Sequence, residues 1–192
     1  MSGLDAVYGF VFKGAIAQDS VRRTVGALGG PADDAESKIR AKMPFALLDD
    51  DLVTSARKMA HVYTAIAAFE NSARKFIQDR LLEEIGADWW DQVPDQVQKD
   101  AEKRKKDEDQ VRWHGARGAS MIYYTQLGDL VKIMRAQLQH FDDHIQGIDW
   151  AQQIFKALER SRNVIMHGGE LSMNDIERVA MNIRDWVNQV GG

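Results

Sequence analysis

The residues in this sequence best suited to chemistry are Arg162, Asn163 and His167, which lie in the stretch Glu-Arg-Ser-Arg-Asn-Val-Ile-Met-His-Gly-Gly at 159–169. Arg162 carries a planar, permanently charged guanidinium that suits phosphate oxygens, and Asn163 carries an amide that both donates and accepts hydrogen bonds. His167 carries an imidazole, the side chain most often used to exchange protons near neutral pH. The three groups could hold a phosphodiester and transfer a proton, so they are the candidate catalytic residues.

The helix that must position these residues is indicated by an apolar arc at helical spacing. Its members are Trp150, Ala151, Ile154, Phe155, Leu158, Ile165 and Met166. Arg162 projects into this arc, where a charged group needs a partner, while Asn163 and His167, four residues apart, share its edge. Gly168 and Gly169 predict the end of the helix. Because Arg-x4-His is a short pattern, an ordinary helix end with a surface histidine stays an alternative.

Composition limits the class of protein. The chain has 192 residues, no cysteine and a net charge of −4, so it is long enough for one domain with its own core, and it forms no disulfide. The acidic balance argues against a protein that coats nucleic acid through bulk positive charge, so any RNA site must be local. No apolar run suits a signal peptide or a membrane span. We expect a soluble, cytoplasmic protein that does not act at a membrane.

The first 44 residues are predicted to be a helical extension of unknown role, which precedes a main helical domain at 45–192. Residues 4–28 have helix-spaced apolar positions interrupted by glycines, which predicts one or two modest helices. A turn at 29–31 and a short helix at 33–43 follow. The function of this part is not indicated by its residues.

A long core helix is predicted over 50–77 because apolar residues recur every three or four positions. The central stripe is Leu52, Ala56, Met59, Tyr63, Ile66, Ala73 and Ile77. Glu70 stands where this stripe would continue, and a buried carboxylate needs a partner. It can pair with Arg74 on its own helix, or it can reach Arg162 on a neighbouring helix. Glu70, Asn71 and Arg74 are therefore candidate supporting residues of the site.

The segments between the two key helices carry weaker signals. The loop at 86–94 holds two tryptophans, which we interpret as a packing plug rather than a platform for bases. Residues 95–112 have almost no apolar face and predict a solvated helix, whose basic cluster at 103–106 is flanked by acids and favours a solubilising surface over an RNA contact. Residues 119–141 predict another core helix.

His140 and His144 have a spacing that can place two imidazoles on one helix face as metal ligands. No cysteine can join them, and no third histidine is near in sequence. We therefore expect surface histidines near a helix end and no metal site.

The last segment predicts an amphipathic helix over 176–190. Ser172 and Asp175 have the spacing of a capping box at its start. With few prolines and many strong helix formers, the expected fold is all-α, an antiparallel helical bundle.

On these residues the chain resembles the HEPN superfamily, and in particular the branch also found in nuclear RNA-surveillance endoribonucleases. The signature of that family is Arg-x4–6-His, commonly with a polar residue after the arginine, and Arg162, Asn163 and His167 match it directly. The resemblance covers about 45–190. Further stretches that carry it are 57–63, 67–74, 89–90, 124–130, 175–178 and 184–186.

The resemblance implies a domain that dimerises so that two motifs face one cleft and that cleaves RNA without a metal. We expect the homodimer contact to include the motif helix, no other cofactor, and no cleavage of DNA, which lacks the 2′-hydroxyl. Several members are toxins or effectors in toxin–antitoxin, phage-exclusion and CRISPR-linked defence, so an antitoxin or regulatory protein is an expected partner. Other members are not nucleases. The alternative function is therefore a non-catalytic HEPN module that binds a nucleotide or a partner protein.

Elementary chemistry makes the dimer sensible. Attack of a ribose 2′-hydroxyl on its own phosphate calls for a proton acceptor, a proton donor and stabilisation of negative charge. One chain has a single histidine, His167, in the motif. Two chains would supply two imidazoles and would also concentrate positive charge locally.

Overall fold

The computed structural model describes residues 31–111 and 113–190, and every regular element within these ranges is a helix. The predicted all-α fold is thereby confirmed. The described residues fall into two units, one that ends at Val53 and one that begins at Thr54. The domain boundary expected at 44–45 stays a prediction. No helix in the described ranges is both long and apolar enough to cross a bilayer.

The first unit contains α2 (Pro31–Lys42) and the short 3-10 helix η1 (Phe45–Leu47). Proline suits the first position of a helix, because the N–H that it lacks would have no partner there and its φ is already helical. The short helix predicted at 33–43 is confirmed. The helices predicted within 4–28, and most of the turn predicted before α2, lie outside the described residues.

The long helix α3 (Asp50–Glu84) supplies the backbone of the second unit from Thr54 onward. Asp49 caps its start, since its carboxylate accepts the N–H of Asp51 at 2.9 Å and that of Leu52 at 3.2 Å. The long core helix predicted from the sequence is confirmed. Its buried stripe consists of Met59, Val62, Ile66, Phe69, Ala73, Ile77 and Leu81.

The predicted stripe of α3 is wrong at Leu52, Ala56 and Tyr63, whose side chains are exposed. The buried positions step through 59, 62, 66 and 69, so Ala56 and Tyr63 lie at the edge of the apolar face rather than at its centre. Tyr63 instead lines a cleft on the surface of the second unit.

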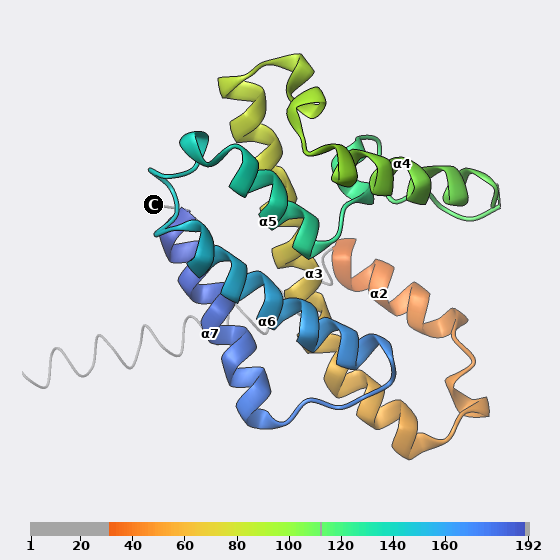
Figure 1. Cartoon of the computed structure of the whole chain (residues 1–192). Coiled ribbons are helices and arrows are strands. Elements are labelled where there is room, and N and C mark those ends of the chain that lie inside the picture. Colours follow the sequence, from red (N-terminus) through yellow and green to blue (C-terminus); the bar gives the residue numbers. More distant parts are fainter. Residues whose placement is uncertain (1–30, 112, 191–192) are drawn as a thin grey trace, which may run out of the picture. The chain divides into compact units, whose positions relative to one another are not determined.

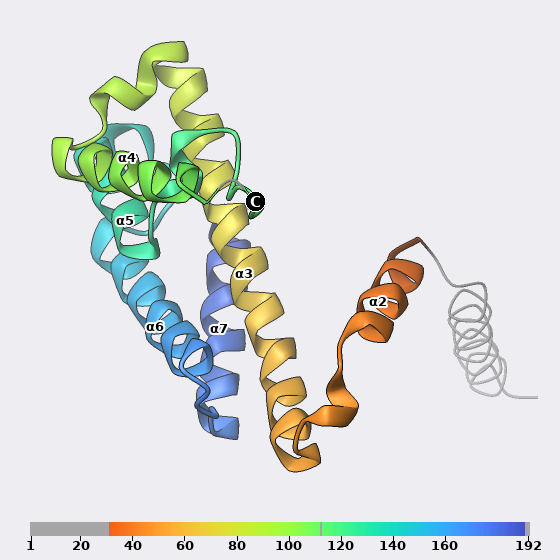
Figure 2. The ribbon, with the colours of Figure 1, turned by 90° about the vertical axis from the view of Figure 1, so that its right-hand side faces the viewer.

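The core of the second unit lies between α3, α5 (Leu127–Ala136), α6 (Ile148–Met166) and α7 (Met173–Val190). Helices α6 and α7 lie side by side and run antiparallel, as predicted for a bundle (Figures 1 and 2). Trp186 of α7 is buried at the centre. Its ring centroid lies 5.0, 5.9 and 6.0 Å from those of Phe155, Phe69 and Phe76. Aromatic rings in such edge-on contacts add to the stability gained by burial alone.

Two weaker predictions about the segment after α3 are confirmed. The tryptophan-bearing loop forms the short 3-10 helix η2 (Ala87–Gln92), and Trp89 is buried in the core, so it serves packing. Helix α4 (Asp95–Asp109) buries Val97 and Ala101 and leaves most of its charged side chains in solvent.

The single core helix predicted at 119–141 is wrong. The segment is instead divided into η3 (Met121–Tyr124), α5 and η4 (Leu138–His140). Thr125 and Gln126 interrupt it with extended backbone, at ψ values of 156° and 166°.

Asp129 explains why α5 begins where it does. Its carboxylate accepts the N–H of Gln126 at 3.0 Å, which completes a capping box. Arg104 of α4 donates to Asp129 at 3.0 Å and to the carbonyl of Tyr124 at 2.8 Å, and Lys132 lies 2.9 Å from the same carboxylate. Burial alone would raise the pKa of Asp129, but the Gln126 N–H and the two cations outweigh burial and hold this pKa below its ordinary value.

His140 and His144 do not share a helix face, because they lie in η4 and in the turns that follow it. His140 lies 3.5 Å from the carboxylate of Glu84, and the His144 ring packs edge-on against Phe76 at 5.9 Å. Within the described residues, no group of three or more His, Cys, Asp or Glu side chains could hold a metal ion.

The capping box predicted before α7 is confirmed. The Asp175 N–H donates to Ser172 Oγ at 3.2 Å, and the Ser172 N–H donates to the Asp175 carboxylate at 3.3 Å. The capping box therefore fixes the point at which the loop after α6 ends and α7 begins.

Candidate active site

The end of α6 places His167 at the helix terminus. Gly168 has a φ of +77°, a conformation that glycine adopts without strain. Its N–H donates to the carbonyl of Ile165 at 3.0 Å, and the Gly169 N–H donates to that of Val164 at 2.8 Å, the two bonds of a Schellman motif. The helix stop predicted at these glycines is confirmed. His167 caps this terminus, and its side chain is exposed to solvent.

Arg162 has the partner that its position in an apolar arc requires. Its Nη1 lies 3.3 Å from the carboxylate of Glu70 on α3, and its Nη2 donates to the Asn163 side-chain oxygen at 3.4 Å. The side chain is 24% exposed, so one side of the guanidinium is fixed by the protein while the group still reaches the surface. The predicted contact between Glu70 and the motif helix is confirmed.

Glu70 also pairs with Arg74, so both partners considered from the sequence are present at once. Arg74 donates further to the carbonyl of Thr125 at 2.9 Å and to the side chain of Asn71 at 3.0 Å. Glu70 and Arg74 are 8% and 9% exposed. One nearly buried carboxylate therefore stands between two guanidiniums, and this cluster carries a net positive charge.

These side chains open into a cleft of about 710 Å³ on the second unit. Its walls come from α3, from the loop after α4, from η3 and the two residues after it, and from the end of α6. The cleft is lined by Tyr63, Ala67, Glu70, Asn71, Arg74, Arg117, Tyr123, Thr125, Gln126, Arg162, Asn163, Met166 and His167. All six predicted site residues thus lie along one cleft.

The charges along the cleft are unbalanced. Arg74, Arg117 and Arg162 line it together with His167, whereas Glu70 is the carboxylate among the lining residues. Arg117 also lies 3.1 Å from Glu108, but its side chain is about half exposed, so solvent weakens that pair. A chain that is acidic as a whole therefore presents a locally cationic cleft, which suits a phosphate-bearing ligand.

The cleft contains residues that the spacing patterns did not indicate. Tyr63 was assigned to the core by its period, and Tyr123 lies within the helix that was predicted at 119–141. Arg117 lies in a segment without a periodic signal. Gln126 lies within the stretch 124–130 that carries the family resemblance. Gly118 packs so closely on Tyr123 that an added Cβ would lie 2.5 Å from its ring. Only the fold brings these side chains beside the motif.

Comparison of the sequence with known protein families gives a match over most of the second unit. The family model for Swt1-like HEPN domains matches residues 64–191. No curated protein and no solved structure gives a significant match. The matched range includes every residue that lines the cleft except Tyr63. The chain therefore belongs to the HEPN superfamily, as a Swt1-like HEPN protein.

Proposed function

We propose that this protein is a metal-independent endoribonuclease that cuts single-stranded RNA. The observation that carries the proposal is that Arg162, Asn163 and His167 line one cationic cleft, whose walls also hold Arg74 and Arg117. Ribonucleases are frequent among HEPN domains. A flexible single strand can adjust its 2′-hydroxyl to the geometry of such a site, and DNA lacks that hydroxyl.

In the proposed reaction, the 2′-oxygen of one nucleotide attacks its own 3′-phosphorus, and the bond from phosphorus to the 5′-oxygen of the next nucleotide breaks. The products are a 2′,3′-cyclic phosphate and a 5′-hydroxyl. One imidazole takes the proton of the 2′-hydroxyl or returns a proton to the leaving oxygen, which is the role of His167. Arg162 stabilises the charge that develops on the phosphoryl oxygens, and Asn163 orients them.

Glu70 acts through Arg162 and is therefore a positioning residue. Its contact at 3.3 Å fixes Nη1 of the guanidinium, and the pair with Arg74 in turn fixes Glu70. A guanidinium held in place before substrate arrives needs less reorganisation during the reaction.

We further propose that the active form is a homodimer in contact through the end of α6. A single motif supplies one imidazole, whereas the reaction uses both an acid and a base. Met166, which precedes His167 at the end of α6, is 61% exposed, so an apolar side chain is available for a protein contact there. In this form the enzyme would serve as a toxin or effector of a defence or RNA-processing system, restrained by an antitoxin or regulatory protein.

The test is cleavage of a labelled single-stranded RNA with EDTA present. We expect the wild-type protein to cut RNA and to leave DNA of the same sequence intact. His167→Ala should abolish cleavage, whereas the matched control His61→Ala, which removes an exposed histidine of α3 that does not line the cleft, should cut normally. Circular dichroism and light scattering would show whether the variants keep their helices and their oligomeric state.

Two results would overturn the mechanism. One is cleavage that requires added Mg²⁺, and the other is a His167→Ala protein as active as wild type. A folded protein that binds a nucleotide or a partner protein and cuts no RNA would instead support the non-catalytic function.

A further inference from the structure

Two further hollows adjoin the cleft along one side of α6. The first, of about 450 Å³, shares Asn163 and His167 with the cleft and extends past Arg160 to Lys156. The second, of about 360 Å³, shares Lys156 with the first and continues between α5 and α6. The three hollows therefore follow one another along the helix. From Lys156 to His167 the path is about 16 Å long, at about 1.5 Å per helical residue.

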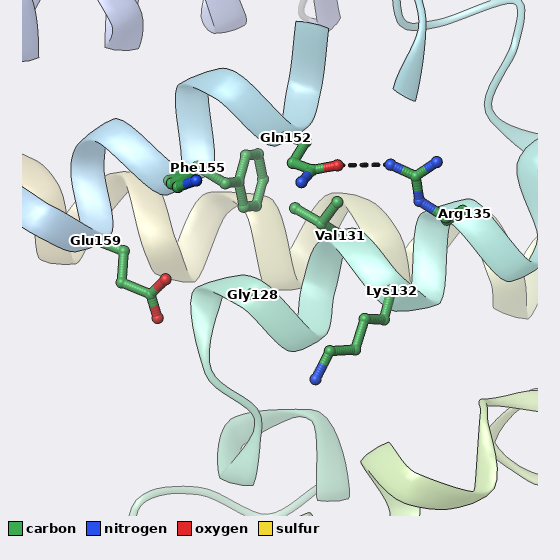
Figure 3. Close-up of a pocket in the computed structure, with 8 residues that line it drawn as sticks. Gly128, Val131, Lys132, Arg135, Gln152, Phe155 and Glu159 are labelled. Atoms are coloured by element: carbon green, nitrogen blue, oxygen red, sulfur yellow. Dashed lines mark hydrogen bonds between the residues drawn. The ribbon is translucent and has the colours of Figure 1, made fainter. Parts of the chain in front are cut away.

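The second hollow has an apolar floor and a charged rim. Figure 3 shows Val131 of α5 and Phe155 of α6 between the two helices, with Arg135 reaching across to Gln152. Lys132 and Lys156 also line this hollow. Phe155 is almost completely buried, so it offers no ring face for a base to stack on. The accessible binding groups are the cations of the rim.

Most of the cations that line the two hollows are available to a ligand. Lys132 is the exception, because it lies 2.9 Å from the carboxylate of Asp129. Lys156 and Arg160 are exposed, and neither makes an ion pair within the described part of the chain. Arg135 lies 3.2 Å from Asp149, but both side chains are about half exposed or more, and ion pairs in solvent are weak enough to exchange.

Glu159 is the carboxylate among the residues that line the two hollows, and it lies near the start of α5. A Cβ added at Gly128 would lie 3.8 Å from its carboxylate oxygen, so this charge sits beside the first turn of α5. The dipole at a helix N-terminus favours a negative charge there. Glu159 offsets part of the positive charge, but Arg135, Lys156 and Arg160 outnumber it among the residues that line the two hollows.

We propose that these two hollows bind the segment of single-stranded RNA that flanks the cut, through its phosphates, and we call them the RNA track. The inference rests on the proposed function. Charge identifies the occupant: Lys156 and Arg160 are exposed cations that make no ion pair within the described residues, and the phosphates of a polyanion neutralise such charges. Continuity with the cleft gives the strand a path from the motif along α6. Contacts to phosphates carry no sequence information, so the track should favour longer RNA irrespective of its sequence.

The test is binding of 2′-O-methyl oligouridylates, which cannot be cut by attack of their own 2′-oxygen. A dinucleotide has a single internucleotide phosphate and can occupy the motif alone, whereas an oligomer of about 16 nucleotides spans both the cleft and the track. Fluorescence anisotropy would measure affinity at several KCl concentrations for wild type, for the double variant Lys156→Gln, Arg160→Gln, and for a control. The control, Lys99→Gln, Arg184→Gln, removes the same charge from exposed positions on α4 and α7 that line none of the three hollows.

We expect the double variant to bind the longer oligomer more weakly than wild type does. The slope of log affinity against log salt should become less steep by about 1.4, because two phosphate contacts are lost and each contributes about 0.7 for a single strand. The loss should be smaller for the dinucleotide, and the control should resemble wild type. An unchanged slope would overturn the track, and so would an equal loss for both oligomers, or a wild-type protein that binds neither. A wild-type protein that binds both oligomers and cuts no cleavable RNA would overturn the nuclease but keep the track.

Discussion

Removing the carboxylate of Glu70 should be among the most damaging changes to the second unit. Glu70→Ala leaves two guanidiniums facing each other, and Arg74 is only 9% exposed. Breaking a buried ion pair typically costs about 3–5 kcal/mol, because an uncompensated charge stays buried. Arg162 is partly exposed, so solvent screens its share. We expect a loss of about 3–5 kcal/mol from a folding free energy that is typically about 5–15 kcal/mol.

The assay is urea unfolding followed by circular dichroism. The matched control is Asp79→Ala, which breaks the pair of Lys75 with Asp79 on the same helix and at the same spacing, but in solvent. The control should have little effect on the unfolding midpoint. A loss below about 1 kcal/mol for Glu70→Ala would refute the reasoning, because it would mean that the carboxylate does not compensate the buried cations.

A double-mutant cycle separates the two partners of Glu70. Arg74 is more buried than Arg162 and holds Thr125 as well, so the coupling of Glu70 with Arg74 should be the larger one in stability. Coupling with Arg162 should appear in cleavage rates instead. Glu70→Gln keeps an acceptor but loses the charge, so it distinguishes electrostatics from packing.

Three further predictions concern other parts of the site. Folding lowers the pKa of Asp129, so the contribution of its carboxylate to stability is present above about pH 4 and is lost as the pH falls below that value. In a plot of the urea midpoint against pH, Asp129→Asn should therefore flatten the decline on the acid side. Gly168→Ala places a Cβ on a residue with a φ of +77°, which should cost about 1–2 kcal/mol in thermal unfolding and displace His167 enough to slow cleavage; an unchanged melting temperature would contradict this. We expect the Tyr123 ring to stack on a base, so Tyr123→Ala should weaken binding of single-stranded RNA by about 1–3 kcal/mol, whereas Tyr123→Phe should bind like wild type. In Gly118→Val the new side chain would collide with the Tyr123 ring, so this variant should resemble Tyr123→Ala when binding is measured by fluorescence anisotropy.

Periodicity predicted the elements that form the core because burial in a bundle selects apolar residues at every third or fourth position. This signal identified α3, α6 and α7, and it also marked Glu70 and Arg162 as charges placed where apolar residues were expected. Two such misfits on neighbouring helices predicted their contact, which lies at 3.3 Å. The end of α6 was predictable for a local reason, since paired glycines suit the Schellman motif.

The break between η3 and α5 could not be predicted in this way. Apolar residues continue through 121–134 at helical spacing, but the backbone turns extended at Thr125 and Gln126 because Arg104, Arg74 and Asp129 bind the groups around it. Two of these partners come from other helices. The same long-range contacts hold η3 and the residues after it against α4 and α3. Tyr123 therefore lines the cleft although its place in the sequence did not predict it.

The measurement that tests the central claim most directly is end-group analysis of RNA treated with this protein in EDTA. Mass spectrometry of the fragments from a short single-stranded RNA would identify both new ends. Wild type should produce 2′,3′-cyclic phosphate and 5′-hydroxyl ends, and His167→Ala should produce neither. Fragments with a 5′-phosphate and a 3′-hydroxyl, or intact RNA after treatment with a folded, dimeric protein, would contradict the account.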